Sequence, residues 1–325
     1  MSGGWNTIES DAGVFTYLLD NLGVKDVQFE ELLSLDPDSL AQLYPLYGVI
    51  FLFKFPTDSP YRAEGDKPLD GYFDYAAAES PRLFFATQTI PNACGTQALL
   101  SVLLNKTESI EIGSTLKDFR EFTIDLPAEF RGEALSNSDV IRDVHNSFAK
   151  SSPFVDETVR NANDETEDAF HFIAYTPFEG RLYELDGLQP APISHGGCTE
   201  EEFPGKVIDV IQRRIARYGD AEIRFNLLAM TRDLRIRARE IGDLELLERE
   251  VQKRKEWQYE NALRKHNFVG FAGEVLRGVV AAKLKAGEEE YDKWIEGGKQ
   301  KLLKRIEDRQ KGKGGGGGDD VEIEG

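Results

Sequence analysis

The sequence contains few of the residues that build disulfide frameworks and metal sites. Among its 325 residues are two cysteines, Cys94 and Cys198. Two cysteines cannot supply the several disulfide bonds on which small secreted domains depend. The four histidines are His145, His171, His195 and His266. They are scattered and show no zinc-ligand spacing with the cysteines. We therefore expect no disulfide framework, no metal ion and no cofactor.

Long apolar runs are absent as well. The stretch "YGVIFLFKF" at 47–55 contains a lysine and is shorter than the ~20 residues that cross a bilayer. The opening residues "MSGGWNTIESDAGVF" have neither the basic start nor the apolar segment of a secretory signal peptide. We expect a soluble, intracellular protein that does not associate with membranes.

Acidic residues outnumber basic residues, 58 to 39, and give a net charge of −19. The first 230 residues hold 38 acidic and 18 basic residues, a charge of −20, whereas residues 231–325 hold 20 and 21 and are nearly neutral. An acidic surface repels phosphate backbones, so nucleic acid is a poor candidate for a partner. A basic ligand is favoured, although acidity can also serve solubility alone.

Hydrophobic periodicity predicts a mixed first part of the chain, because strands stand near both of its ends with helices between them. These strands and helices favour one α/β or α+β domain. The predicted helices are 11–22, 36–43, 93–104, 126–150 with a break at its Gly-Glu pair, and 204–218; the predicted strands are 47–55, 82–88, 222–230 and a hairpin over 169–188.

The remaining segments differ in composition. Residues 56–80 are rich in Pro, Asp and Gly and are predicted to be a loop. Residues 151–168 are polar, acidic and without periodicity, which is typical of a lid or a disordered segment. From Thr231 to about Gln310 the pattern is almost entirely helical, and the glycine-rich end is predicted to be disordered.

Cys94 lies in "QTIPNACGTQALL", where a Pro-broken segment leads into an apolar helix. If Asn92 caps that helix, Cys94 falls in the first turn, where free N–H groups favour a thiolate. A lone cysteine is more often buried and inert. The position therefore suggests a nucleophile without deciding between the two interpretations.

The hairpin supplies two further candidates. If Glu179 and Gly180 form a two-residue turn, Asp186 lies opposite Ile173, and His171 shares its face of the sheet because side chains two apart point the same way. A cysteine at a helix start with a paired histidine and carboxylate is the arrangement of cysteine hydrolases. A loop one residue longer would separate the pair, and a half-buried strand histidine remains the simpler interpretation.

Gln88 lies six residues before Cys94, at the end of the predicted strand. Its amide could bind an oxyanion together with the backbone N–H of Cys94. A glutamine in such a place carries little weight alone.

These stretches, with the opening "WNTIESDAGVFTYLLDNLGV" and "LPAEFRGEALSNSDVIRDVHNSFA", resemble the ubiquitin C-terminal hydrolase family of cysteine peptidases, in its larger, proteasome-associated branch. The resemblance implies an α+β fold: a papain-like α-β-α catalytic domain with a central antiparallel sheet and a knotted backbone, followed by an all-helical extension. It divides the chain into a catalytic domain at 1–231, a helical domain at 232–311 and a disordered tail at 312–325. The loop at about 151–168 would be the crossover loop over the site.

The resemblance also assigns roles. Cys94 would be the nucleophile, His171 the general base and then acid, Asp186 the orienting carboxylate and Gln88 the oxyanion-hole donor. The substrate would be ubiquitin, cleaved after its C-terminal glycine. The branch also implies docking of the helical region on the proteasomal ubiquitin receptor, a chromatin-remodelling complex as a further partner, and location in the cytoplasm and nucleus.

Two departures and two alternatives accompany this interpretation. Gly95 stands where the larger branch is expected to carry alanine, and the glycine run at 314–318 follows the Lys/Glu-rich segment that would bind the receptor. A papain-like peptidase of broad specificity is disfavoured by a loop over the cleft. A ubiquitin-binding adaptor with little intrinsic turnover would not need the four candidate site residues.

Overall fold

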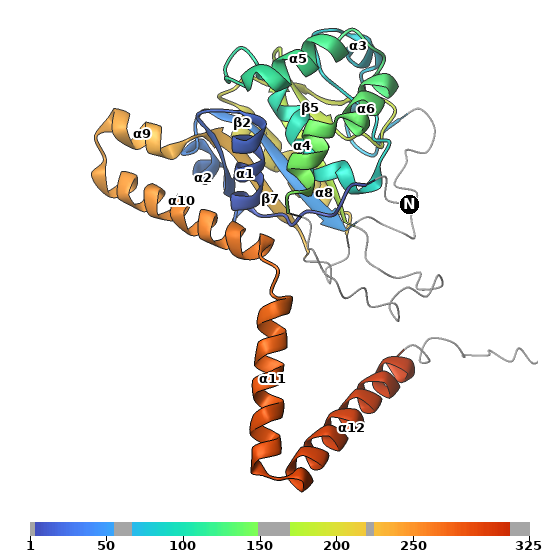
Figure 1. The fold of residues 1–325 in the computed structure, drawn as a ribbon. Helices are drawn as coiled ribbons and strands as arrows, with labels where there is room; N and C mark the ends of the chain where they lie inside the picture. Colours follow the sequence, from blue (N-terminus) through green and yellow to red (C-terminus); the bar gives the residue numbers. More distant parts are fainter. Residues whose placement is uncertain (1–3, 55–66, 149–169, 219–223, 313–325) are drawn as a thin grey trace, which may run out of the picture. The chain divides into compact units, whose positions relative to one another are not determined.

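The structure is a computed structural model that describes residues 4–54, 67–148, 170–218 and 224–312 (Figure 1). The chain divides into two compact units, residues 1–266 and 267–325. Two predicted segments, the loop at 151–168 and nearly all of the tail at 312–325, lie outside the described residues.

A seven-stranded sheet forms the centre of the first unit, and every neighbouring pair of its strands is antiparallel. The order is β1-β7-β2-β4-β5-β6-β3. The strands are β1 Val27–Glu31, β2 Leu46–Lys54, β3 Tyr72–Phe73, β4 Phe170–Phe178, β5 Arg181–Leu185, β6 Ile193–Gly197 and β7 Asn226–Arg232. The aromatic and β-branched residues of β2 and β4 suit them to the buried middle of the sheet.

Helices of the first unit flank this sheet. They are α1 Ala12–Leu22, α2 Pro37–Ala41, α3 Tyr75–Glu79, α4 Cys94–Leu103, α5 Gly113–Thr123, α6 Ala128–Asn137, α7 Asp139–Asn146, α8 Phe203–Ile215, α9 Leu234–Ile241 and α10 Leu244–Lys265. A 3-10 turn, Pro91–Ala93, leads into α4. The second unit has α11 Val269–Ala286 and α12 Glu288–Gly312.

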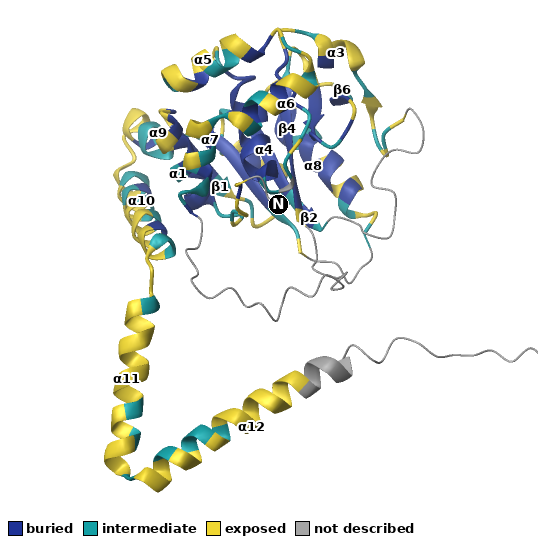
Figure 2. Cartoon of the chain, turned by 45° about the vertical axis from the view of Figure 1, so that its right-hand side comes forward, coloured by how far each residue is buried: buried dark blue, intermediate teal, exposed yellow. Residues whose placement is uncertain are grey.

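The two faces of the sheet bury separate cores. Along β2, Ile50 packs into the core that contains α1 and α4, whereas Phe51 and Phe53 pack into the core that contains α8. This division follows from the alternation of side chains along a strand. Helices therefore cover both faces, as the predicted α-β-α arrangement requires, and the buried residues concentrate in the sheet and in α4 (Figure 2).

The predicted strand at 82–88 is wrong. Its residues 83–86 are buried, as their apolar pattern indicates, but side chains instead of a neighbouring strand bind their backbone. Asn105 accepts from the N–H of Phe84 at 2.7 Å and donates to its carbonyl at 2.9 Å. Gln97 donates to one further carbonyl of the segment at 2.6 Å, and Arg131 donates to two others at 3.0 and 3.2 Å. The residues that favour strands are those that suit a half-buried surface. Their pattern therefore cannot show whether side chains or a neighbouring strand will bind the backbone.

Other predicted boundaries shift. The helix break within 126–150 falls at Ser138, whose hydroxyl caps α7, and the Gly-Glu pair lies inside α6. Of the predicted loop at 56–80, residues 56–66 lie outside the described residues, and part of the remainder forms β3 and α3. The hairpin is confirmed, because Phe178 pairs with Arg181 across a turn in which Glu179 and Gly180 both have positive φ.

Helices α9 and α10 belong to the first compact unit, beyond the boundary predicted at 231 and 232. Helix α10 packs on α1 (Figure 1). The Asn261 side chain donates to the Gly13 carbonyl at 3.0 Å, and the Trp257 ring lies against Gly13. Arg264 pairs with Asp11, the cap of α1, at 2.9 Å. The domain boundary at 231 and 232 stays a prediction. The contacts of α9 and α10 place residues up to His266 in the same compact unit as the sheet.

The second unit is helical, in keeping with the predicted helical pattern. Helix α11 has no buried residue (Figure 2). Several of its apolar side chains are exposed, among them Phe271, Val275 and Leu276. No helix within the described ranges has the length and apolar character needed to cross a membrane.

We predict that Gly132→Ala destabilises the protein strongly. A Cβ at this position of α6 would lie 1.9 Å from the Thr87 carbonyl oxygen, so the segment leading to Gln88 would have to move. We expect urea unfolding to show that the free energy of unfolding falls by about 3 kcal/mol, which is the upper end of the usual cost of an overpacked core. Gly205→Ala in α8 is the control, since nothing lies within 4 Å of its Cβ position and stability should not fall. Equal stabilities of the two variants would contradict this packing.

Candidate active site

Cys94 is the first residue of α4 and is buried, with 8% of its surface exposed. The predicted cap is wrong: no side chain caps the helix, and the Asn92 amide donates to the Trp5 carbonyl at 3.1 Å. The amide thereby ties the amino-terminal segment to the turn before Cys94. Cys94 lies in the first turn of α4, as the sequence indicates, at the end of the helix where the backbone dipole favours negative charge.

His171 and Asp186 meet as the predicted hairpin register requires. Ala174 pairs with Leu185, so the register carried one residue further sets Ile173 opposite Asp186. His171 Nε2 lies 2.7 Å from Asp186 Oδ1, and both side chains are almost completely buried. The structure thus joins two residues that lie 15 apart in sequence.

The turn after β5 holds the Asp186 carboxylate. Oδ1 also accepts from the Leu188 N–H at 3.0 Å, and Oδ2 accepts from the Gln189 side chain at 3.4 Å. These donors bind the ionised form and fix the orientation of the carboxylate toward the histidine.

The Cys94 thiol lies within hydrogen-bonding reach of the His171 ring. Since Nε2 faces Asp186, Nδ1 is the ring nitrogen that meets the thiol. Burial lowers the pKa of His171, but the Asp186 carboxylate and the thiol outweigh burial and raise the pKa to about 9. An imidazolium beside a thiol favours the thiolate, which is the nucleophilic form.

The segment that carries Gln88 adjoins the turn that carries Asp186. The Gln88 N–H donates to the Gly187 carbonyl at 2.8 Å. A Cβ on Gly187 would come within 2.8 Å of Gln88 and 2.1 Å of the Gln97 amide, so only glycine permits this approach. The structure therefore brings Gln88 to the same region as His171 and Asp186, although Gln88 does not lie in a strand.

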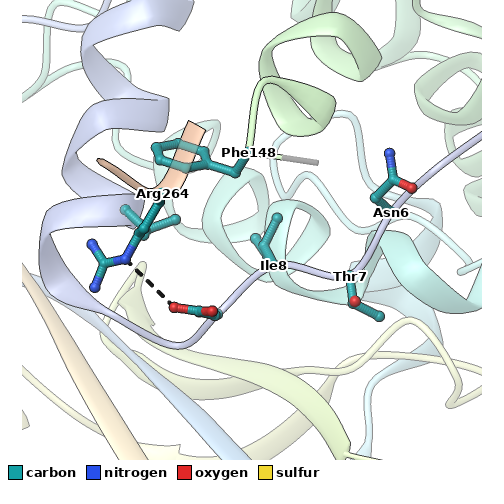
Figure 3. Close-up of a pocket in the computed structure, with 7 residues that line it drawn as sticks. Asn6, Thr7, Ile8, Phe148 and Arg264 are labelled. Atoms are coloured by element: carbon teal, nitrogen blue, oxygen red, sulfur yellow. Dashed lines mark ion pairs between the residues drawn. The ribbon is translucent and has the colours of Figure 1, made fainter. Parts of the chain in front are cut away.

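Two cavities adjoin these residues. One, of about 270 Å³, is lined by the amino-terminal segment, Phe148 and Arg264 of α10 (Figure 3). Its wall residue Ile8 packs against Gly95, next to Cys94. The other has a volume of about 590 Å³. It is lined by Thr87, the residue before Gln88, and by residues 188–190, which follow Asp186 and Gly187. Each cavity has a wall residue beside the candidate site, Ile8 in the first and Thr87 in the second, but none of the four candidate residues lines either cavity.

Sequence reasoning missed Gln97 and Gly187, which hold the two sides of the site together. Gln97 lies in a largely apolar helix. A buried side-chain amide needs hydrogen-bond partners, so this glutamine indicated a contact with another part of the chain. Gly187 follows the predicted carboxylate directly, where a glycine suggests close approach of another backbone.

The remaining candidates for chemistry lie elsewhere. The Cys198 Sγ donates to the Thr199 carbonyl at 3.3 Å, and burial raises the pKa of this thiol. Within the part of the chain that the structure describes, no three His, Cys, Asp or Glu side chains form a group that could hold a metal ion.

Comparison with known proteins gives a consistent result. Residues 5–216 match the family model described as "Ubiquitin carboxyl-terminal hydrolase, family 1", and residues 241–284 match a second, "Ubiquitin carboxyl-terminal hydrolases". Ubiquitin carboxyl-terminal hydrolase 2 of Schizosaccharomyces pombe is 52% identical over 86% of this chain and 92% of its own length. Ubiquitin carboxyl-terminal hydrolase isozyme L5 of Dictyostelium discoideum is 44% identical over 71% of this chain and 62% of its own length.

Solved structures agree. The crystal structure of Trichinella spiralis UCH37 bound to ubiquitin vinyl methyl ester matches with a TM-score of 0.59 and 33% identity. The match covers 80% of this chain and 99% of that one.

We predict that Asp186→Asn lowers the pKa of His171 from about 9, because the Asp186 carboxylate is the strongest influence that raises it against burial. The measurement is an NMR titration of labelled histidine, with His171→Gln to assign the signal. The pKa of His171 is higher in the folded protein than in the unfolded chain. The His171–Asp186 pair therefore stabilises the fold fully below pH 6.5. This stabilisation is lost as the pH rises through 9. The exposed Asp209→Asn is the control and should leave the titration unchanged.

Proposed function

Since the chain belongs to family 1 of the ubiquitin carboxyl-terminal hydrolases, a family of deubiquitinating cysteine peptidases, we propose that it cleaves after the C-terminal glycine of ubiquitin with Cys94, His171 and Asp186 as its triad. The observation that carries this proposal is the 2.7 Å contact between His171 and Asp186 beside the Cys94 thiol. A pure binding adaptor has no need of that geometry.

The chemistry follows from the placement of the three groups. The Cys94 thiolate attacks the carbonyl carbon of the terminal glycine, while the His171 imidazolium gives its Nδ1 proton to the leaving amine as the C–N bond breaks. Water then attacks the thioester with His171 as the base, which releases the ubiquitin carboxylate and restores the thiol. Asp186 holds the ring orientation and stabilises the imidazolium throughout.

Gln88 has the role of oxyanion-hole donor in this proposal. Support comes from its backbone bond to Gly187, which fixes the segment beside the Asp186 turn and ahead of the nucleophile helix. The side-chain amide and the Cys94 N–H would share the negative oxygen.

The charge of the first 230 residues suits a basic substrate tail. The acidic first 230 residues would speed the approach of the basic tail of ubiquitin, more so at low salt.

We extend the proposal to partners. The second family match lies within the helical region, and α11 exposes apolar side chains that a partner could cover. This supports docking of residues 232–311 on a proteasomal ubiquitin receptor or on a chromatin-remodelling complex, in the cytoplasm and nucleus.

The experiment is covalent labelling with ubiquitin that carries a C-terminal thiol-reactive electrophile. We expect the full chain to form a stoichiometric adduct and Cys94→Ala to form none. Cys198→Ala is the matched control, because it removes the other buried thiol, and it should label like wild type. Labelling of Cys94→Ala would refute the proposed nucleophile. No labelling of wild type would leave the adaptor as the better interpretation.

A second test concerns Gln88. We expect Gln88→Ala to lower kcat on a fluorogenic ubiquitin amide by about 10²–10³-fold, the usual loss for an oxyanion donor, with little change in KM. Thr89→Ala is the control, since this exposed neighbour lies outside the proposed machinery. A kcat close to that of the control would remove Gln88 from the mechanism.

A further inference from the structure

A buried ion pair lies on the α8 face of the sheet, close to the proposed catalytic histidine. Arg214 of α8 places Nη1 2.6 Å from Oε1 of Glu184 on β5. Their side chains are 11% and 4% exposed. The other carboxylate oxygen of Glu184 lies 3.2 Å from His195 Nε2. Buried ion pairs often add little net stability, so stability alone does not explain the Arg214–Glu184 pair.

The Arg214 guanidinium has a second contact, with the ring of Phe53. Its Cζ lies 4.7 Å from the ring centroid, within the range of a cation–π interaction. Phe53 is completely buried and also stacks on Phe51, with centroids 5.5 Å apart. The ring is therefore held by a cation and by an aromatic neighbour.

The Phe53 ring in turn faces His171. The two residues are directly paired between β2 and β4, and their rings meet edge to face with centroids 5.8 Å apart at 86°. Cross-strand neighbours at this distance restrict each other's rotamers. Phe53 thus forms one wall of the space in which the His171 ring is held.

The sheet order explains why Arg214 can act here. Strand β4, which carries His171, lies between β2 and β5. Arg214 reaches Phe53 on β2 and Glu184 on β5, so its contacts span the strand of the histidine. Glu184 also lies two residues before Asp186 and shares its face, so the same side of the sheet presents both carboxylates.

We propose that Arg214 is a positioning residue for His171 and acts through the Phe53 ring, with Glu184 fixing the guanidinium in place. The inference rests on the proposed triad. It assigns no contact with substrate to Arg214: the residue limits how far the imidazole turns away from Asp186 and Cys94. A small misorientation of a catalytic group is enough to slow the chemical step.

The test compares Arg214→Met with Arg213→Met, using turnover of a fluorogenic ubiquitin amide by the full chain. Arg213 is the preceding residue of α8, 54% exposed and paired with Asp70 at 3.0 Å. We expect Arg214→Met to lower kcat about tenfold with KM within about twofold, because the histidine is misplaced while the ubiquitin surface is intact. Arg213→Met should behave as wild type. Arg214→Lys, which keeps a cation for the ring, should recover part of the loss.

Arg214→Met leaves Glu184 buried without its cation and could fail to fold. The double variant Arg214→Met/Glu184→Gln removes both charges and avoids this problem. It should fold and show the same loss of kcat. A folded Arg214→Met or double variant with kcat within twofold of Arg213→Met would overturn the proposal, as would an Arg214→Lys no better than Arg214→Met.

The ring has a matched control of its own. Phe53→Leu and Phe51→Leu remove the same volume from the same buried face of β2, but only Phe53 is paired with His171. We expect the larger loss of kcat in Phe53→Leu at similar loss of stability, and equal losses would contradict the proposed route. Failure of the triad itself would appear separately, as turnover that survives Cys94→Ala.

Discussion

The antiparallel pairing of β4 with β5 is the constraint on which the site depends. A two-residue turn at Glu179 and Gly180 sets the register, and that register places His171 and Asp186 on one face within hydrogen-bonding distance. A slip of one residue would turn every side chain of one strand to the opposite face. The positive φ of both turn residues therefore matters to the chemistry at the far end of the hairpin.

The part of the site that contains Gln88 and Cys94 depends on side chains that bind the backbone where a neighbouring strand could have done so. The extended segment before α4 obtains its hydrogen bonds from Asn105, Gln97 and Arg131. Buried backbone groups require partners, and these three residues provide them without adding a ladder to the sheet. The segment can then run outside the sheet and bring Gln88 and the start of α4 to the hairpin, with Gly187 at the point of contact.

Much of this architecture could be predicted from sequence because its determinants are local. The hairpin follows from turn chemistry, and the helices at α1, α4 and α8 follow from periodicity. The errors have a common cause. Asn92 was predicted to cap a helix, and 82–88 to be a strand, yet the actual partners, Trp5 and Arg131, lie far away in sequence. The docking of α10 on α1 was missed for the same reason: Asn261 and Gly13 are 248 residues apart.

The close fit of α10 on α1 also defines a tether. Helix α10 ends at Lys265 and α11 begins at Val269, so only His266, Asn267 and Phe268 separate them. Three residues reach about 10 Å at full extension. A protein bound to the second unit is therefore joined to the catalytic unit by a short covalent link, whatever the orientation of the two units. Substrate carried by such a protein would meet the enzyme as an intramolecular neighbour, and weak direct affinity for that substrate would suffice.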